Sequence, residues 1–294
     1  MIQTILLIAI VGLVVARLWT AIENREGFAD QNEYALLANP EPGKPYDGIP
    51  PTPYDDISPS GPGDDDPRDL PWIASWSAAD RFARQGQNCA VKYVRAGEDN
   101  TTIVTTSKSC EAGMPHTRAG GRIIIPDSIP DALQAEIIAH EYIHIFQRRN
   151  PEVWATFYRR NWSFVLHKEP PASMPASVAE ARRGNPDTFG IPWACWMGRI
   201  WPVPVYTNPQ APSLREARTV WWDDWQRKVL LTPPANWTAF FGTPSQDEHP
   251  HEMAAVMIVA GDTMTEAGRR LMNWWRSDGA TAKASRKSQG SLEE

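Results

Sequence analysis

A proline-rich segment divides the chain and limits where a compact domain can form. Residues 40–71 contain ten of the 27 prolines in the 294-residue chain, together with two runs of aspartate. Each proline removes a backbone hydrogen-bond donor, and clustered carboxylates repel one another, so this segment is expected to stay extended and solvated. We therefore predict a Pro/Asp-rich spacer over residues 23–71, a folded domain over residues 72–276 and a disordered polar tail over residues 277–294.

The N-terminal residues predict a membrane segment. Residues 2–16 carry no charge, and residues 18–22 extend the apolar run beyond Arg17. The whole run is about as long as a helix that crosses ~30 Å of hydrocarbon. Because no Lys or Arg precedes it and no small-x-small site follows it, a retained transmembrane helix over residues 1–22 is favoured over a cleaved signal peptide. Arg17 and Arg25 favour a single-pass protein whose C-terminal domain lies on the cytoplasmic face of the membrane.

Composition excludes some partners and leaves the cysteines open. The formal net charge is −6, and no basic cluster with interleaved aromatic residues occurs, so we expect no nucleic-acid partner. Fourteen tryptophans indicate a core rich in aromatic area. Three cysteines are too few for a disulfide scaffold. Cys89 and Cys110 flank a predicted hairpin, and the sequence leaves open whether they pair or remain buried thiols.

The run His140-Glu141-Tyr142-Ile143-His144 has the spacing of a metal site. On a helix, residues four positions apart lie on one face, so both imidazoles can reach the same ion. Glu141 lies beside the metal, where it can take a proton from a zinc-bound water whose pKa the metal lowers toward neutrality. The motif therefore predicts Zn²⁺, with His140 and His144 as ligands and Glu141 as general base.

The residues around this motif predict a long helix. Ser128 is a suitable N-cap, with Asp131 three residues later. Asn150, which precedes Pro151, marks the end of the helix. Ile137 shares a face with both histidines, and most of the remaining side chains are also apolar. A helix that is apolar nearly all round is buried, so the histidines and the glutamate within it must be hydrogen-bonded or metal-bound. Hydrogen-bonded core histidines are the alternative to zinc.

Hydrophobic patterning predicts the remaining elements. Further helices are expected over residues 78–85, 153–164, 250–260 and 265–275. Strands are expected over residues 89–95, 101–107 and 122–125. An aromatic stripe on the second of these helices is interpreted as core and consists of Trp154, Phe157, Tyr158 and Trp162. Residues 165–247 are rich in proline and tryptophan and show no clear period, so no element is predicted there.

Two histidines on one helix need a third protein ligand to hold zinc. The stretch Glu248-His249-Pro250-His251-Glu252 places two acids and two histidines around a proline that can begin a helix. Glu252 would lie in the first turn of that helix, and an alanine three positions later would let it approach the metal helix closely. Glu248 would lie in the preceding loop. Both glutamates remain open as the third ligand, and the stretch could instead be a charged helix cap.

With these two motifs the chain resembles the zincin metallopeptidases, specifically the gluzincin pattern of H-E-x-x-H followed by a glutamate on a later helix. The resemblance implies an α+β zincin-like domain over residues 72–276, with a small sheet and an active-site helix. It implies His140, His144 and Glu252 as zinc ligands and Glu141 as catalytic base, with Glu248 as the alternate ligand. The strand over residues 122–125 would be the edge to which an extended peptide adds. Val256 stands where the thermolysin-type motif has an aspartate.

The same resemblance implies a side chain that stabilises the oxyanion beside the metal. His251 is predicted in this catalytic role because it neighbours the third ligand, with His249 and Tyr206 as alternatives. His116 is interpreted as structural, and His167 carries no functional signal.

We therefore expect a membrane-anchored zinc metallopeptidase that acts on peptides or proteins. The competing hypothesis is a structural protein of a membrane-containing virion, assembled into a larger particle, with the zincin domain kept as a scaffold. The phrase Met114-Pro115-His116-Thr117 and the pattern H-E-x-I-H-x-x-Q-R resemble metallopeptidases of large DNA viruses. A zinc hydrolase of non-peptide amides would share every one of these features.

Overall fold

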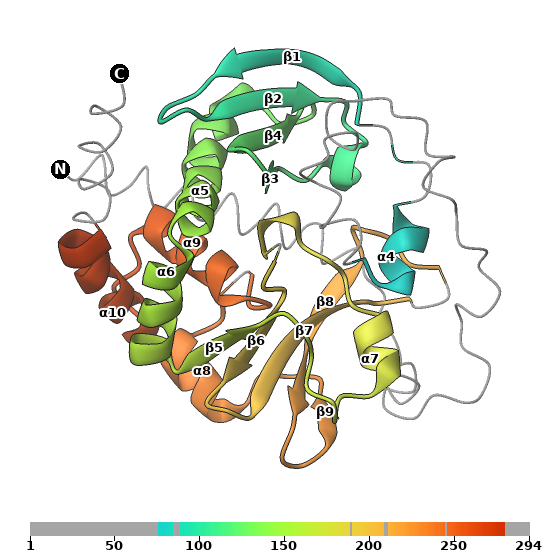
Figure 1. Cartoon of the computed structure of the whole chain (residues 1–294), viewed down its shortest axis with the longest axis vertical. Helices are drawn as coiled ribbons and strands as arrows, with labels where there is room; N and C mark the ends of the chain where they lie inside the picture. The colour runs from blue at the N-terminus through green and yellow to red at the C-terminus, as the bar shows by residue number, and fades with distance from the viewer. Residues whose placement is uncertain are drawn as a thin grey trace.

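The computed structural model describes residues 76–84, 87, 89–188, 190–208, 211–244 and 246–279. The predicted transmembrane helix, the spacer and most of the predicted tail lie outside the described residues. Among the described residues, none of the helices has the length and apolarity needed to cross a membrane. The described part is an α+β arrangement of two small sheets with helices packed between and around them (Figure 1).

The first sheet has four strands in the order β1-β2-β4-β3. Its strands are β1 (Val91–Ala96), β2 (Thr102–Thr106), β3 (His116–Arg118) and β4 (Arg122–Pro126). β1 and β2 form the predicted antiparallel hairpin, β2 runs parallel to β4, and β3 pairs antiparallel with β4. The strands expected over residues 89–95, 101–107 and 122–125 are confirmed with small shifts of their ends. β3 was not predicted.

The predicted role of β4 as a free edge is wrong. β4 is bonded to β2 on one side and to β3 on the other, and all five of its residues are buried. A run of β-branched residues buried on both faces is typical of an interior strand. The edge of the sheet on this side is β3.

The second sheet is antiparallel, with five strands in chain order. Its strands are β5 (Phe164–His167), β6 (Trp193–Trp196), β7 (Ile200–Tyr206), β8 (Ala217–Asp223) and β9 (Lys228–Leu230). No element was predicted here because β6 and nearly all of β7 are buried on both faces, which removes the alternating pattern. The prolines within β7 also disfavoured the prediction of a strand from the sequence. Pro204 accepts a hydrogen bond from Arg183 on the side away from β8, so its missing N–H costs no bond to β8.

Helices α4, α5, α6, α9 and α10 correspond to predicted helices, and α7 and α8 were not predicted. The helices are α4 (Ala78–Ala83), α5 (Asp131–Arg149), α6 (Pro151–Phe157), α7 (Ala176–Glu180), α8 (Ala235–Phe241), α9 (Pro250–Ala260) and α10 (Glu266–Trp274). Short turns of other helix types are η2 (Cys110–Gly113), η3 (Tyr158–Trp162), η4 (Pro186–Thr188) and η5 (Trp275–Gly279). The helix expected over residues 153–164 begins at Pro151 and ends at Trp162, because Phe164 already belongs to β5.

Helix α5 differs from its prediction in two respects. Its N-cap is Pro130 and not Ser128. A residue before a proline is disfavoured in helical conformation, so Ile129 stays outside the helix. The helix is also not buried all round: Asp131 and Ala135 in its first half are exposed, and its buried side chains lie in the second half.

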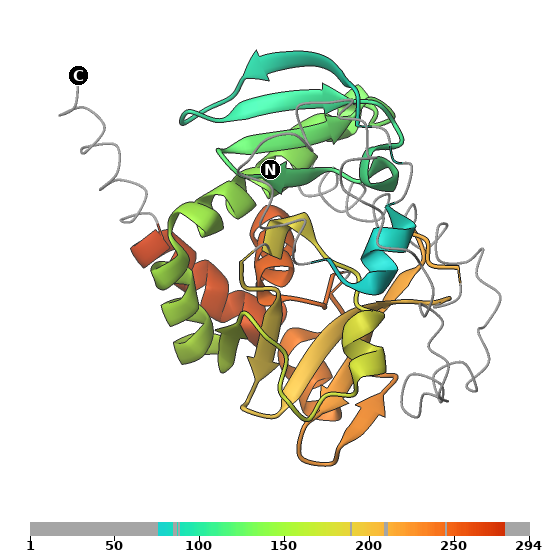
Figure 2. The ribbon, with the colours of Figure 1, turned by 45° about the vertical axis from the view of Figure 1, so that its right-hand side comes forward.

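The second half of α5 joins two hydrophobic clusters. Ile145 packs with the isoleucines of β2 and β4, whereas Ile143 packs into an aromatic core between α6, α8, α9, α10 and the second sheet. The predicted stripe lies in that core, with Trp154, Phe157, Tyr158 and Trp162 each at most 1% exposed. Figures 1 and 2 show α5 running from behind the first sheet to this core, with α9 beside it. The second half of α5 is thereby held between the two sheets.

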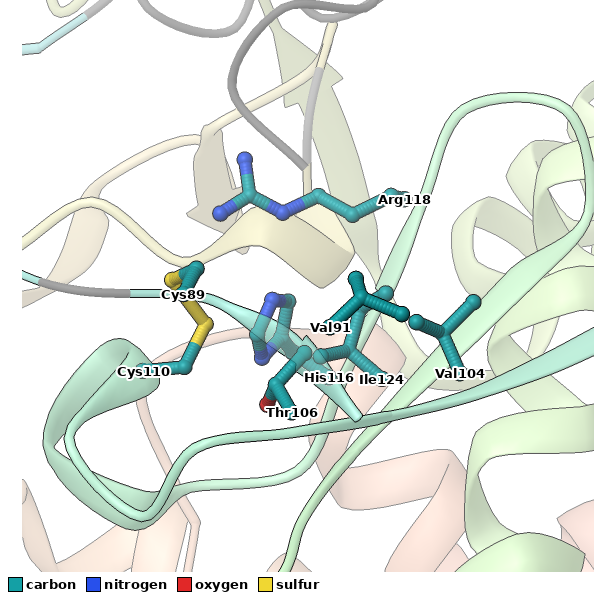
Figure 3. A pocket seen from close by; sticks show the side chains of 8 residues that line it. All are labelled: Cys89, Val91, Val104, Thr106, Cys110, His116, Arg118 and Ile124. Carbon is teal, nitrogen blue, oxygen red and sulfur yellow. A yellow bond between two sulfur atoms is a disulfide. The ribbon is translucent and has the colours of Figure 1, made fainter. Parts of the chain in front are cut away.

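The question of the cysteines is resolved by a disulfide between Cys89 and Cys110. It joins the segment just before β1 to η2, and Cys195 is free and buried. Both bonded cysteines line a small internal cavity together with His116 and Ile124 (Figure 3).

Candidate metal centre

Three side-chain atoms from two helices meet at one point. The Nε2 atoms of His140 and His144 are 2.9 Å apart, and they lie 3.4 and 3.3 Å from Oε2 of Glu252. Ligand atoms at the usual zinc bond lengths in a tetrahedral site are about 3.3 Å from one another. Two imidazole nitrogens and one carboxylate oxygen are also a donor set that catalytic zinc sites use, with the fourth position left for water. The residues present therefore fit zinc.

Local structure explains this convergence. His140 and His144 are one turn apart on α5. Pro250 opens α9, where the His249 side chain accepts the His251 backbone N–H as an N-cap. Glu252 follows in the first turn, where the helix dipole favours a negative charge. Ala254 and Ala255 are fully buried, and these small side chains allow α9 to pack closely against α5.

A buried glutamine orients His144. The Nδ1–H of His144 donates to Oε1 of Gln147 over 2.7 Å, which leaves Nε2 as the atom that can bind a metal. The amide nitrogen of Gln147 donates to the His251 carbonyl over 2.9 Å and to the Tyr158 hydroxyl over 3.2 Å. Because both ends of this amide are bonded, its orientation is defined. No role was predicted for Gln147, although its position three residues after His144 puts it on the same helix face.

An asparagine orients Glu252 in the same way. The Nδ2 of Asn185 donates to Oε1 of Glu252 over 2.9 Å, so Oε2 is the oxygen turned toward the histidines. Asn185 lies just before η4, in a segment where no element was predicted. It is 67 positions from Glu252 in sequence, and no local pattern signals the contact.

Glu141 lies beside the three ligand atoms. Its side chain is 3% exposed, and its Oε2 has no hydrogen-bond partner among the described residues. A carboxylate oxygen of Glu141, a carboxylate oxygen of Asp187 and a ring nitrogen of His144 all lie within 4.8 Å of one another. Burial raises the pKa of Glu141 well above its ordinary value, and the charges of Asp187 and Glu252 raise it further. A buried carboxyl with a free oxygen and a raised pKa holds a proton more strongly than an ordinary glutamate, which suits a group that accepts a proton and passes it on.

The charges of His144 and Glu252 are balanced against each other. Burial alone would lower the pKa of His144, but the carboxylates of Glu252 and Asp187 outweigh it and raise that pKa to about 10. Burial alone would raise the pKa of Glu252, but His144 and His140 outweigh it and hold that pKa well below its ordinary value. The Glu252 carboxylate is therefore ionised, and it compensates the positive charge of protonated His144.

The other members of the second motif occupy different positions. Glu248 stays outside the ligand group, and burial together with repulsion from Glu252 raises its pKa to about 8. His249 uses both ring nitrogens, toward the Ile191 carbonyl at 3.0 Å and the His251 backbone N–H at 3.2 Å. His251 is buried against Tyr158, with ring centroids 5.4 Å apart. Within the part of the chain that the structure describes, its Nδ1 has no hydrogen-bond partner.

The remaining candidates lie in other contacts. The Tyr206 hydroxyl donates to Asp80 over 2.7 Å, inside a buried network with Arg84. His116 is buried in β3, and its Nδ1 donates to the Met114 carbonyl over 3.0 Å. His167 packs against Trp201 with ring centroids 4.8 Å apart. Each of these side chains therefore has a contact that ties it to the surrounding structure.

Comparison with known proteins adds no relative: no family model, no curated protein and no solved structure matches the chain.

Proposed function

We propose that this protein is a zinc-dependent metallopeptidase with His140, His144 and Glu252 as zinc ligands and Glu141 as general base. The observation that carries the proposal is the convergence of the three ligand atoms within 2.9–3.4 Å of one another. The hydrogen bonds from Gln147 and Asn185 support it, because they turn the ligand atoms toward one point. Hydrogen-bonded core histidines alone do not account for a buried glutamate that Asn185 orients toward them.

The proposed reaction is hydrolysis of a peptide bond. Zinc, when bound, would polarise the scissile carbonyl and acidify the attacking water. Glu141 would accept the proton of that water at Oε2 and pass it to the leaving amine nitrogen, while the new C–O bond forms and the C–N bond breaks. Burial of Glu141 supports this role, because it raises the affinity of the carboxylate for the proton that it must carry. His251 remains the proposed oxyanion stabiliser, on the basis of its place one residue before Glu252.

We further propose that residues 1–22 anchor this domain to a membrane and that the spacer holds it away from the surface. The disulfide between Cys89 and Cys110 bears on which side the domain faces. Disulfides persist in oxidising compartments and at the surfaces of cells and virions, and they are rare in the cytosol. This bond favours the oxidising side of the membrane over the cytoplasmic face that Arg17 and Arg25 indicate.

The test is Glu141→Gln in the full-length, zinc-loaded protein. We expect the variant to retain one zinc per chain and to lose at least ~100-fold of its turnover of an unfolded protein such as casein, because only the proton transfer is removed. Zinc would be measured by elemental analysis beside the wild type. Loss of zinc in the variant would make Glu141 structural. A zinc-loaded wild type without turnover would leave the metal as part of a scaffold, as in the virion hypothesis.

A further inference from the structure

β3, the strand beside the candidate metal centre, lies at the edge of its sheet but is not open to solvent. All three residues of β3 are buried, with Thr117 fully inaccessible. Thr117 is paired with Ile123 of β4, yet its backbone N–H donates to Oδ1 of Asp187 over 2.7 Å. The Thr117 hydroxyl donates to the same oxygen over 2.6 Å. A side chain therefore occupies the main-chain donor that an edge strand ordinarily presents to solvent.

Asp187 is held there by the turn formed by residues 185–188. Asp187 and Pro186 belong to η4, which packs against both β3 and α9. Arg148 of α5 donates to the Pro186 carbonyl over 3.1 Å and to the Thr117 hydroxyl over 2.8 Å. Asn185 accepts the Asp187 backbone N–H over 2.9 Å and bonds Glu252 through its other amide atom. The 185–188 turn thus connects the sheet edge to both helices of the metal centre.

Asp187 accepts from β3 the kind of hydrogen bond that a bound peptide would accept. An extended peptide that adds to a sheet edge accepts the free N–H groups of that edge with its own carbonyl oxygens. Asp187 presents an oxygen to Thr117 in the same way, and its carboxylate lies within 4.8 Å of both Glu141 and His144. Access to the metal centre is also narrow: His140 is 18% exposed at its side chain, and the side chains of His144 and Glu252 are at most 2% exposed.

We propose that the 185–188 turn is an internal blocking element, in which Asp187 competes with an extended peptide for the Thr117 amide. The described conformation is then the closed form of the site, and a peptide reaches β3 only when the turn moves away from it. This inference rests on the proposed function, because it concerns the substrate edge of the same site. The two proposals make opposite predictions for a buried carboxylate. Removal of the Glu141 carboxylate should abolish turnover, whereas removal of the Asp187 carboxylate should strengthen peptide binding.

The test measures peptide binding without turnover. Full-length, zinc-loaded protein carrying Glu141→Gln would be titrated with fluorescein-labelled casein, with and without Asp187→Ala, and followed by fluorescence anisotropy. We expect Asp187→Ala to tighten binding at least ~10-fold. In the Glu141-containing enzyme the same change should lower KM by a similar factor. Casein should also slow hydrogen exchange of the Thr117 amide in the Asp187→Ala protein.

Two further variants serve as a control and as a milder substitution. Asp224→Ala is the matched control. Asp224 also accepts a hydrogen bond from a hydroxyl group, that of Ser173, but it lies in the turn between β8 and β9. It should leave binding unchanged. Asp187→Asn preserves the shape of the side chain if the alanine variant does not fold, and its neutral oxygen is a weaker acceptor, so a gain of about threefold is expected.

The outcomes separate the two proposals. The blocking element is overturned if Asp187→Ala binds casein no tighter than its parent, if Asp224→Ala gains as much, or if bound casein leaves Thr117 exchange unchanged. Zinc content and turnover of the wild type report separately on the peptidase. A protein with zinc and no turnover, whose Asp187→Ala variant still gains binding at Thr117, would end the peptidase proposal and retain the blocking element.

Discussion

Two amide side chains, Gln147 and Asn185, decide which atoms of the proposed ligands face one another. Gln147 accepts a hydrogen bond from the Nδ1–H of His144, and the side-chain amide of Asn185 donates one to Oε1 of Glu252. Both amides are themselves held by backbone groups, Gln147 by the His251 carbonyl and Asn185 by the Asp187 N–H. Partners of this kind fix the tautomer and the orientation of a ligand, so their loss weakens metal binding even though no ligand is removed.

We predict that Gln147→Leu lowers zinc affinity about 10- to 100-fold, because His144 loses the acceptor that fixes its Nδ1–H. Affinity would be measured by competition with a chromophoric chelator. Gln134→Leu is the control: Gln134 lies on the exposed half of α5 and bonds only Asp131 among its described contacts. Equal affinity in both variants would mean that Gln147 does not orient the ligand.

The two glutamates left open by the sequence can be separated by their metal content. We predict that Glu252→Ala loses stoichiometric zinc and that Glu248→Ala retains it, since only Glu252 lies in the ligand group of the described residues. Elemental analysis of both folded proteins after dialysis checks this. The opposite pattern would make Glu248 the third ligand.

At the scale of elements, the disulfide joins the residues just before β1 to η2. Its cysteines are 21 positions apart, and a closed loop of this size stabilises the native state by about 3 kcal/mol through the entropy of the unfolded chain. We predict that Cys110→Ser costs about this free energy of unfolding, measured by urea denaturation at pH 7. Reductant should destabilise the wild type by a similar amount.

The Cys89→Ser/Cys110→Ser double variant is the control for the reductant, because it has no disulfide to lose. Its unfolding curve should be the same with and without reductant. A reductant-sensitive double variant would assign the effect to some other group.

At the scale of the whole molecule, the domain contains buried groups that resist protonation. Burial and the charge of Arg118 together lower the pKa of His116 to about 4. Burial alone would raise the pKa of Glu111, but Arg84 and Arg118 outweigh it and lower that pKa to about 2. Both folded-state values lie below the ordinary ones of 6.5 and 4.5. As the pH falls, the unfolded chain therefore binds each proton first, which destabilises the folded domain.

We predict acid destabilisation in two windows: between pH 6.5 and about 4 from His116, and between pH 4.5 and about 2 from Glu111. From pH 7 to pH 5 the His116 contribution is about 2 kcal/mol. Urea denaturation in excess chelator would show this as a smaller pH dependence in His116→Gln than in the wild type. His167→Gln, at a half-buried ring, should keep most of the wild-type dependence. If the free energy of unfolding of His116→Gln depended on pH as strongly as that of the wild type, His116 would not be the source of the acid destabilisation.

Local patterns predicted the elements that carry the candidate metal centre. The four-residue spacing of His140 and His144, the stop at Asn150 and the start at Pro250 are properties of neighbouring residues, and the structure has helices α5 and α9 at these places. The second sheet escaped prediction because its strands are buried on both faces, which erases the alternation that marks a strand.

By itself, therefore, the sequence determined the two helices, the pair of histidines and a short set of candidate third ligands, because these depend on spacing along one helix. Only the tertiary structure placed Glu252, and not Glu248, beside the two histidines, gave Gln147 and Asn185 their partners, and brought Asp187 to the edge of β3. The contacts of Gln147 with His251 and of Asp187 with Thr117 join residues 104 and 70 positions apart. Such contacts form only when separate elements pack together, so no periodicity in the chain encodes them.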